Sequence, residues 1–311
     1  MALANDGSLP LVLFLYEGGD DDDRFCESLM RALADGSRPP SQIAAELDAW
    51  VVRQSSHRFR ELVARPELLE RDETGWVTPR STPNASGYVG TFFQSFPNLC
   101  SVFPLYHPGQ TRIIQFLEAL MAVPEHQAPD YIPDGGDVND VQMMALWPSN
   151  HYATEAFRIG ADAIRYYGSG IEIPGSEPET RWRNYQSCMA HIVMTGFSAC
   201  EFTSALRDIM PCGKECPPSF DVGICNDPQE IGGHIQAAVQ WLIHPDEVRY
   251  VYRQCQKQDR TDEKNPRDTW SMENWRVWKE QLRFFAGDER VDSPARELAR
   301  VAVDQMEKVE A

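Results

Sequence analysis

Apolar side chains recur at every third or fourth position along most of this sequence, which is the period of an α-helix that buries one face. Two helix ends are also recognisable: Ser293 and Pro294 suit an N-cap and a first helical position, and Gly287 suits a C-terminal stop. Alternating strand patterns and internal repeats are missing. We therefore predict an all-α fold, with helices in the segments 22–35, 41–54, 111–123, 150–168, 183–210, 231–243, 246–256, 271–287 and 293–310.

An apolar run at residues 9–16 opens the chain and is followed at once by acidic residues. It is too short to span a bilayer, and no basic residue precedes it as in a signal peptide. We therefore predict an extended N-terminal segment over residues 1–23 and a single helical domain over residues 24–311. This domain should be an irregular multi-helix bundle around a buried central helix at about 183–210. The Gly- and Pro-rich connection at 168–178 is a candidate boundary between two lobes.

The charge of the chain narrows the range of partners. Its 47 acidic and 29 basic side chains give a formal net charge of −18, and the basic residues form no cluster. Phosphate backbones and anionic membrane surfaces attract clustered Lys and Arg, so we expect neither nucleic acid nor a membrane as partner. The expected ligand is a small apolar molecule, and a homodimer is left open. With no targeting segment recognised, we expect a cytoplasmic protein whose eight cysteines are mostly reduced.

Several segments in a fixed order resemble a known family. They are FRELVARPELL, YHPGQTRIIQFLEALMAVP, AHIVMTGFSACEFTSALRDIM, IQAAVQWLIH and the C-terminal stretch that begins with WRVWKEQLRFFAGDERVDSPARELAR. Together they are similar to the fungal family catalogued only as domain of unknown function number 3632. The resemblance implies a fungal, intracellular, mainly helical protein, and it supplies no catalytic residue.

The segment 183–201 raises the question of function, because it contains an uncharged polar seam on an otherwise apolar helix. Asn184, Ser187, His191, Thr195 and Ser198 recur at helical spacing and fall within an arc of about 80°. A helix face in water normally carries Glu, Lys or Arg, whereas small uncharged groups are usually satisfied inside the protein. The seam is therefore either a line of hydrogen bonds between packed helices or the wall of an enclosed pocket, with a weakly solvated surface as a third explanation.

If the seam lines a pocket, His191 is its only side chain that titrates near neutral pH and is the candidate general acid/base. We then expect a cofactor-independent enzyme of fungal secondary metabolism that isomerises or cyclises a small, mostly apolar substrate. The alternative is a non-catalytic helical protein for interaction or ligand transport, in which the seam only fixes the helix register. In the enzyme interpretation, the substrate-binding candidates are Asn184, Tyr185, Ser187, Thr195, Ser198, Trp241, Trp147, Tyr152, His107 and His234.

Several of these candidates also have ordinary structural explanations. His107 precedes a predicted helix, where its ring can cap the first amide groups. His234 opens the helix that carries Trp241 and fits a core position equally well. Trp147 and Tyr152 offer aromatic walls only if the fold brings them to the seam.

Metal and cofactor motifs are incomplete. Cys212, Cys216 and Cys225 with His234 have the ligand count of a tetrahedral zinc site, but they lack the paired C-x2-C spacing. A thiol-rich loop or a disulfide explains them as well. Asp22, Asp23 and Glu27 resemble one half of the Mg²⁺-binding motif of terpene synthases, but Asp residues equally suit a helix N-terminus. Because Gly-rich nucleotide loops, G-x-S-x-G and H-E-x-x-H are absent as well, we predict no metal and no cofactor.

Overall fold

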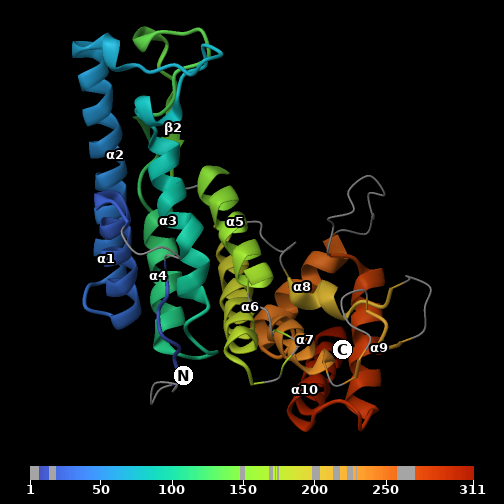
Figure 1. Cartoon of the computed structure of the whole chain (residues 1–311). Coiled ribbons are helices and arrows are strands. Elements are labelled where there is room, and N and C mark those ends of the chain that lie inside the picture. Colours follow the sequence, from blue (N-terminus) through green and yellow to red (C-terminus); the bar gives the residue numbers. More distant parts are fainter. Residues whose placement is uncertain are drawn as a thin grey trace. The chain divides into compact units, whose positions relative to one another are not determined.

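Helices dominate the chain, and this confirms the all-α prediction (Figure 1). A single small antiparallel sheet accompanies them in the described part, formed by β1 (His126–Pro129) and β2 (Met143–Leu146). The computed structural model describes residues 7–13, 19–147, 151–167, 171, 173, 175–197, 204–212, 218–222, 227–228, 230–257 and 270–311, apart from the side chains of 151–152, 161–163 and 165–167.

The chain forms two compact units, each of which has its own core. The first unit consists of Met1–Pro10, Cys100–Gln110 and Ala161–Ala311, and the second consists of Leu11–Leu99 and Thr111–Gly160. Part of the expected lobe boundary at 168–178 lies outside the described residues.

An aromatic cluster holds the second unit together. Phe92, Phe93 and Phe96 project from α3 and meet Phe116 of α4 and Phe157 of α5, with ring centroids 5.2 to 6.0 Å apart. Burying several aromatic rings is among the largest stabilising contributions that a core of this size contains. The elements that lie wholly or partly in this unit are α1 (Asp21–Asp35), α2 (Pro40–Ala64), η1 (Pro66–Leu68), η2 (Pro79–Ser81), α3 (Ala85–Cys100), α4 (Pro108–Met121), β1, η3 (Val138–Asp140), β2 and α5 (His151–Tyr167).

The acidic run before the first helix acts as a cap in this structure. The side chain of Asp20 accepts hydrogen bonds from the backbone amides of Asp22 and Asp23, and the carboxylate of Asp23 accepts one from the backbone amide of Asp20. Such a capping box satisfies amides that have no partner inside the helix. The run therefore has a complete structural role at the start of α1.

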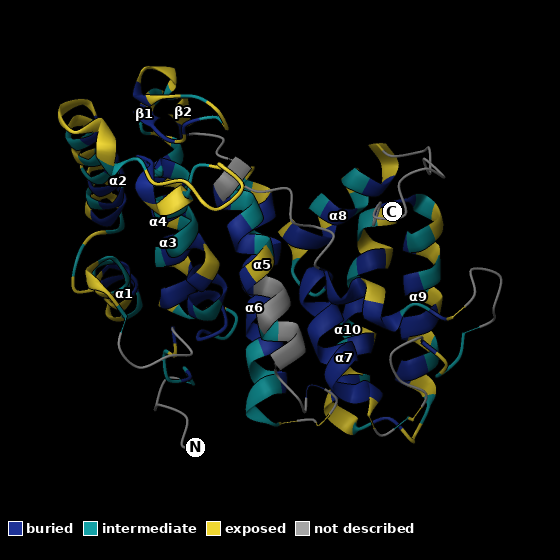
Figure 2. Cartoon of the chain, turned by 45° about the horizontal axis from the view of Figure 1, so that its top comes forward, coloured by how far each residue is buried: buried dark blue, intermediate teal, exposed yellow. Residues whose placement is uncertain are grey.

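The first unit is built around α6 (Glu177–Thr195) and α7 (Ile231–Ala238), which pack against each other. Every residue of α7 is buried (Figure 2). Trp241, Trp270 and Trp278 form a chain of ring contacts in the same core. The remaining elements of this unit are η5 (Ala205–Ile209), η6 (Val239–Trp241), α8 (Pro245–Lys257), α9 (Met272–Gly287) and α10 (Ser293–Glu310).

The prediction of one central helix over 183–210 is wrong at both ends. The helix begins at Glu177, where the side chain of Ser176 accepts from the amide of Glu179, and it ends at Thr195. Gly196 stops it by adopting a left-handed conformation with a φ of 78°, which an L-residue side chain disfavours. Residues 198–203 lie outside the described residues, and the chain continues as the short 3₁₀ helix η5.

The N-cap of the last helix also differs from the sequence prediction. Asp292 is the cap, because its carboxylate accepts from the amide of Ala295, whereas Ser293 is already the first helical residue. Both residue types are good caps, and the choice between adjacent positions depends on the backbone of the preceding turn.

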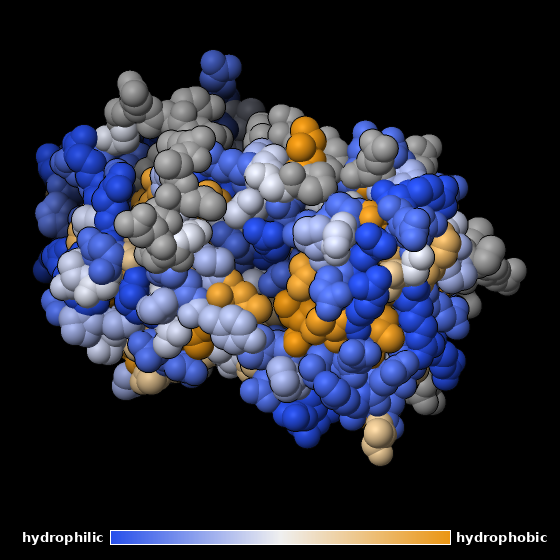
Figure 3. Space-filling view, turned by 90° about the horizontal axis from the view of Figure 1, so that it is seen from below, coloured by the Kyte–Doolittle hydropathy of each residue, from blue (hydrophilic) through white to orange (hydrophobic). Residues whose placement is uncertain are grey.

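The expected N-terminal extended segment is only partly described. Leu9 and Leu13 are buried, and the amide of Leu9 donates to the carbonyl oxygen of Val102 at 2.9 Å. Among the helices that the structure describes, none is both long and apolar enough to cross a membrane. The face seen in Figure 3 is mostly hydrophilic, with separate hydrophobic areas.

Candidate functional site

The polar seam of α6 divides into two parts. At its N-terminal end, Asn184 and Ser187 are buried and are held by the segment that precedes α4 and by the first turn of α4. Asn184 donates to the carbonyl oxygens of Ser101 and Val102 at 3.2 and 3.4 Å. Ser187 lies 3.2 Å from the side-chain nitrogen of Gln110. These hydrogen bonds fasten α6 to its neighbours within the core of the unit.

At the C-terminal end of the seam, His191 meets a carboxylate from another helix. Its Nε2 atom lies 2.6 Å from Oε1 of Glu247, in the first turn of α8. The second carboxylate oxygen of Glu247 lies 3.1 Å from Nδ1 of His244, the residue just before α8. We call these three residues the histidine–glutamate cluster. All three belong to the first unit.

Burial differs sharply within the histidine–glutamate cluster. The Glu247 side chain is only 2% exposed, whereas the side chains of His191 and His244 are 25% and 20% exposed. A carboxylate at that depth is costly unless a neighbouring group neutralises it or shares a proton with it. The two imidazoles are the groups placed to do so, and the N-terminus of α8 adds a favourable dipole.

Each imidazole of the cluster also has a second nitrogen that is not used. Nδ1 of His191 and Nε2 of His244 are shielded from solvent and make no hydrogen bond to the part of the chain that the structure describes. The ring centroids lie 5.9 Å apart, edge to face. In folded proteins, few buried polar atoms lack a hydrogen-bond partner, and those that do call for an explanation such as a catalytic role.

Tyr106 covers His244 and has an unusual backbone. Its ring centroid lies 4.9 Å from that of His244, and 76% of its surface is exposed. Its φ of 66° lies in the left-handed region, which it shares, among described non-glycine residues, with Asn84. For a bulky residue this conformation is strained, and strain of this kind concentrates at binding and catalytic positions.

His107 and Thr195 have local structural contacts. Nδ1 of His107 accepts from the amide of Gly109 at 2.9 Å, and its ring stacks on Phe103. This is the capping role that the sequence allowed. The hydroxyl of Thr195 donates to the carbonyl oxygen of Ile192 and accepts from the amide of Phe197, so it finishes the helix. Ser198 lies outside the described residues.

The aromatic candidates whose side chains are described are buried in cores. Trp241 donates from Nε1 to the side-chain oxygen of Gln186 at 2.7 Å, and Tyr185 stacks on Trp182. His234 is a buried residue of α7. Trp147 belongs to the second unit, and the side chain of Tyr152 lies outside the described residues.

The proposed thiol ligands for a metal are only partly described. Cys212 lies 2.9 Å from a carboxylate oxygen of Asp221, whereas Cys216 and Cys225 fall outside the described residues. Within the described ranges, no three His, Cys, Asp or Glu side chains are arranged to hold a metal ion.

Sequence reasoning singled out His191 but missed Glu247, His244 and Tyr106. A weak signal for two of them exists, since His244 and Glu247 stand three residues apart around the start of a helix, where they share one face. Nothing in the local sequence indicates that this face meets His191.

Comparisons with known proteins give a family and no function. Neither a curated protein nor a solved structure matches this chain. The sequence model of a family described as "Protein of unknown function (DUF3632)" matches residues 94–282, which is more than half of the chain and includes the whole histidine–glutamate cluster and Tyr106. The chain therefore belongs to the DUF3632 family.

Proposed function

We propose that this protein is a cofactor-independent enzyme that transfers a proton within a small, mostly apolar substrate, with the histidine–glutamate cluster as its acid/base centre. The observation that carries the proposal is the buried carboxylate of Glu247, which lies between two partly exposed imidazoles. Each of these keeps a nitrogen that makes no hydrogen bond to the described residues. Isomerisation and cyclisation are the reactions that need only such a transfer.

The roles follow from the contacts. Glu247 orients His191 and balances the positive charge that its ring acquires when it takes a proton from the substrate. Because the same carboxylate also faces His244, the second ring can return a proton at another position of the substrate. His191 then holds one proton more and His244 one proton fewer than before the reaction, and a proton passed from His191 to His244 through the carboxylate of Glu247 restores both rings. No external oxidant or reductant is needed.

Access to the unpaired nitrogens requires a movement, because both atoms are shielded. Tyr106 is the natural candidate for this movement, since its ring lies on His244 and most of its surface faces solvent.

We keep Thr195 in the proposal as a group that orients the substrate, because it lies one turn from His191 and is partly exposed. Asn184 and Ser187 support the helix from the core instead.

The cytoplasmic address is also part of the proposal. Cys26, Cys100, Cys188 and Cys255 are buried free thiols, and reduced thiols are typical of that compartment.

A non-catalytic helical interaction protein is the second candidate. The hydrogen bonds of Asn184 and Ser187 favour it, because they give the nearest polar groups on the same helix face a purely structural use. In this case the histidine–glutamate cluster would only join α6 to α8.

Deuterium incorporation separates the two candidates. The full chain is incubated in D₂O with a library of small enones and unsaturated alcohols, and mass spectrometry detects deuterium on carbon. Wild type should label at least one compound, and His191→Gln should slow that labelling by about a hundredfold or more. His57→Gln is the matched control, because His57 is an exposed histidine whose carboxylate neighbour lies 3.8 Å away. If His191→Gln labels as fast as wild type, or if wild type labels nothing while His191→Gln unfolds, the interaction protein is the better explanation.

A further inference from the structure

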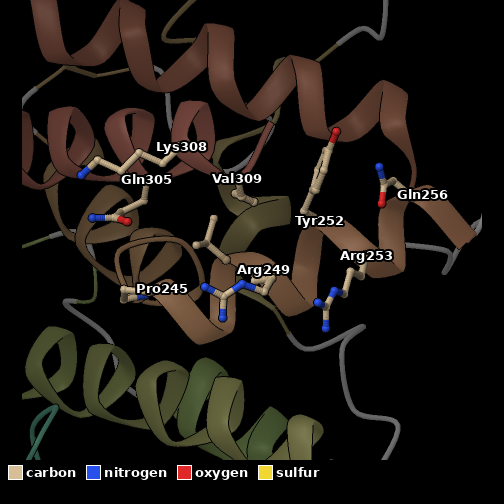
Figure 4. Close-up of a pocket in the computed structure, with 9 residues that line it drawn as sticks. Pro245, Arg249, Tyr252, Arg253, Gln256, Gln305, Lys308 and Val309 are labelled. Carbon is tan, nitrogen blue, oxygen red and sulfur yellow. The ribbon is translucent and has the colours of Figure 1, made fainter. Parts of the chain in front are cut away.

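A basic groove lies between α8 and α10, which pack against each other in the first unit. It has a volume of 380 Å³, which is within the range of small-molecule sites. Figure 4 shows Gln305 and Lys308 reaching from α10, and Arg249, Tyr252 and Arg253 projecting from α8.

Three of the groove residues are cations, and no lining residue is acidic. This is unusual for a chain whose formal net charge is −18. Arg253 and Lys308 are exposed and form no ion pair with any residue in the described ranges. Arg249 contacts Asp246 at 2.8 Å, but both side chains are more than half exposed, so this ion pair contributes little.

Two carboxylates of α10 near the groove bind side chains of α9. Glu310 binds Trp275 and Lys279, each at 2.6 Å, and Glu307 pairs with Arg283. Neither of them forms an ion pair with Lys308, although both lie within two residues of it in α10.

Apolar surface lies next to the cations. The groove is also lined by Val248, Val309 and the ring of Tyr252, which Trp275 supports from behind at a centroid distance of 5.0 Å. A ligand that fits both parts needs an acidic group and a compact organic body. Arg249 and Arg253 stand one turn apart on α8, where two guanidinium groups can hold one phosphate or carboxylate.

We infer that this groove binds a small organic anion, with its acidic group on Arg249 and Arg253 and its organic body against Tyr252, while Lys308 of α10 adds positive charge to the lining. Glu247 lies on roughly the opposite side of α8 by helical periodicity and does not line the groove. The groove is thus a second site, and it stands whether or not the histidine–glutamate cluster is catalytic.

Calorimetry on the full chain with phenyl phosphate tests this inference. Phenyl phosphate contains both the acidic group and the aromatic ring, whereas inorganic phosphate contains only the acidic group and phenol only the ring. Phenyl phosphate should bind with a Kd of about 1 mM or lower, more tightly than either fragment. The amide signals of Tyr252 and Val309 should shift during an NMR titration.

Matched variants locate the binding. Arg249→Gln/Arg253→Gln should weaken it by about tenfold or more, and Lys308→Gln by a smaller factor. Arg207→Gln/Arg276→Gln removes the same charge from exposed positions that do not line the groove and should leave the Kd within about twofold of wild type.

Three outcomes would overturn the inference. The first is no saturation at about ten times the expected Kd, and the second is equal weakening in the groove and control variants. The third is tighter binding of a twelve-residue oligoglutamate than of phenyl phosphate, lost in Arg249→Gln/Arg253→Gln, because the groove would then receive an acidic segment of a protein.

Discussion

Each unit of the chain contains a histidine beside a carboxylate, and the two sites differ in how the imidazole is used. In the second unit, Nε2 of His126 lies 3.0 Å from Asp48, and its Nδ1 lies 2.9 Å from the carbonyl oxygen of Pro124. Asp48 also accepts from Nε1 of Trp147 at 2.8 Å. In the first unit, His191 and His244 share Glu247, and each keeps one nitrogen without a hydrogen bond to described residues.

Hydrogen-bonding groups without partners distinguish the candidate site from an ordinary histidine–carboxylate pair. A histidine–carboxylate pair alone is ordinary, and around His126 both ring nitrogens have acceptors, so the group is complete as a structural contact. The histidine–glutamate cluster is incomplete in this sense, since it combines a deeply buried carboxylate with two imidazole nitrogens that make no hydrogen bond to the described residues. Unsatisfied hydrogen-bonding capacity is the feature that a substrate can use.

The largest expected effect is that of Glu247→Ala. The substitution removes the only carboxylate between two imidazoles and leaves a space at a position that is 2% exposed. We expect a loss of about 3 kcal/mol in local stability. Hydrogen-exchange mass spectrometry should detect it in peptides from α6 and α8, with peptides from α2 as the internal control. Unchanged protection of α6 would mean that the cluster does not join these helices.

Asp48→Ala should have a smaller effect, because Asp48 is 19% exposed and His126 keeps its contact with Pro124. The substitution leaves Nε1 of the buried Trp147 without a partner, and we expect a loss of about 1–2 kcal/mol. The same exchange experiment, read on peptides from α2 and β2, measures it. A loss as large as that of Glu247→Ala would remove the distinction between the two sites.

Most helices were predictable, because their apolar period depends only on nearby residues. The exception is α3 (Ala85–Cys100), which was not among the predicted helices, because two glycines and Pro97 make its segment look irregular in the sequence. The end of α6 was not, since the apolar pattern continues past Gly196 while the backbone turns there. His191 could be singled out because it interrupts an apolar helix. Its partner Glu247 could not be singled out, because the contact depends on how α6 and α8 pack against each other. The residues around Glu247 in the sequence do not indicate that packing.

The seam illustrates the same limit. Asn184 and Ser187 share a helix face with His191, and sequence alone cannot separate their roles. The acceptors of Asn184 are backbone carbonyl groups of Ser101 and Val102, which any residue type would supply. A polar group that is satisfied by backbone atoms therefore leaves no recognisable partner in the sequence.

Tyr106→Gly should separate access to the cluster from its stability. Glycine adopts a φ of 66° without strain, and this gain offsets the lost ring contact with His244. We expect stability within about 1 kcal/mol of wild type, together with faster modification of His244 by diethyl pyrocarbonate. Tyr106→Phe keeps the ring and should react like wild type. Equal rates in all three proteins would show that Tyr106 does not control access to His244.

The weakest effect concerns another buried carboxylate, Glu179 of α6, which accepts from the backbone amide of Gly175 at 3.3 Å but has no close cation. Its nearest cation is Arg183 at 3.8 Å, and one carboxylate oxygen has no hydrogen bond to the described residues. Burial, only partly offset by Arg183, raises the pKa of Glu179. Protonation is therefore easier in the folded chain than in the unfolded chain.

The sign of the resulting pH dependence follows from this shift. The contribution of Glu179 to stability is fully present below the pKa of the unfolded chain and is lost as the pH rises through the higher folded pKa. Glu179→Gln, which is neutral at every pH, should remove this part of the dependence and be more stable than wild type at pH 8, but not at pH 4. Urea unfolding at the two pH values measures it, with the exposed Glu273→Gln as control. A loss of stability at pH 8 would mean that the ionised carboxylate binds Arg183 well enough to overcome burial.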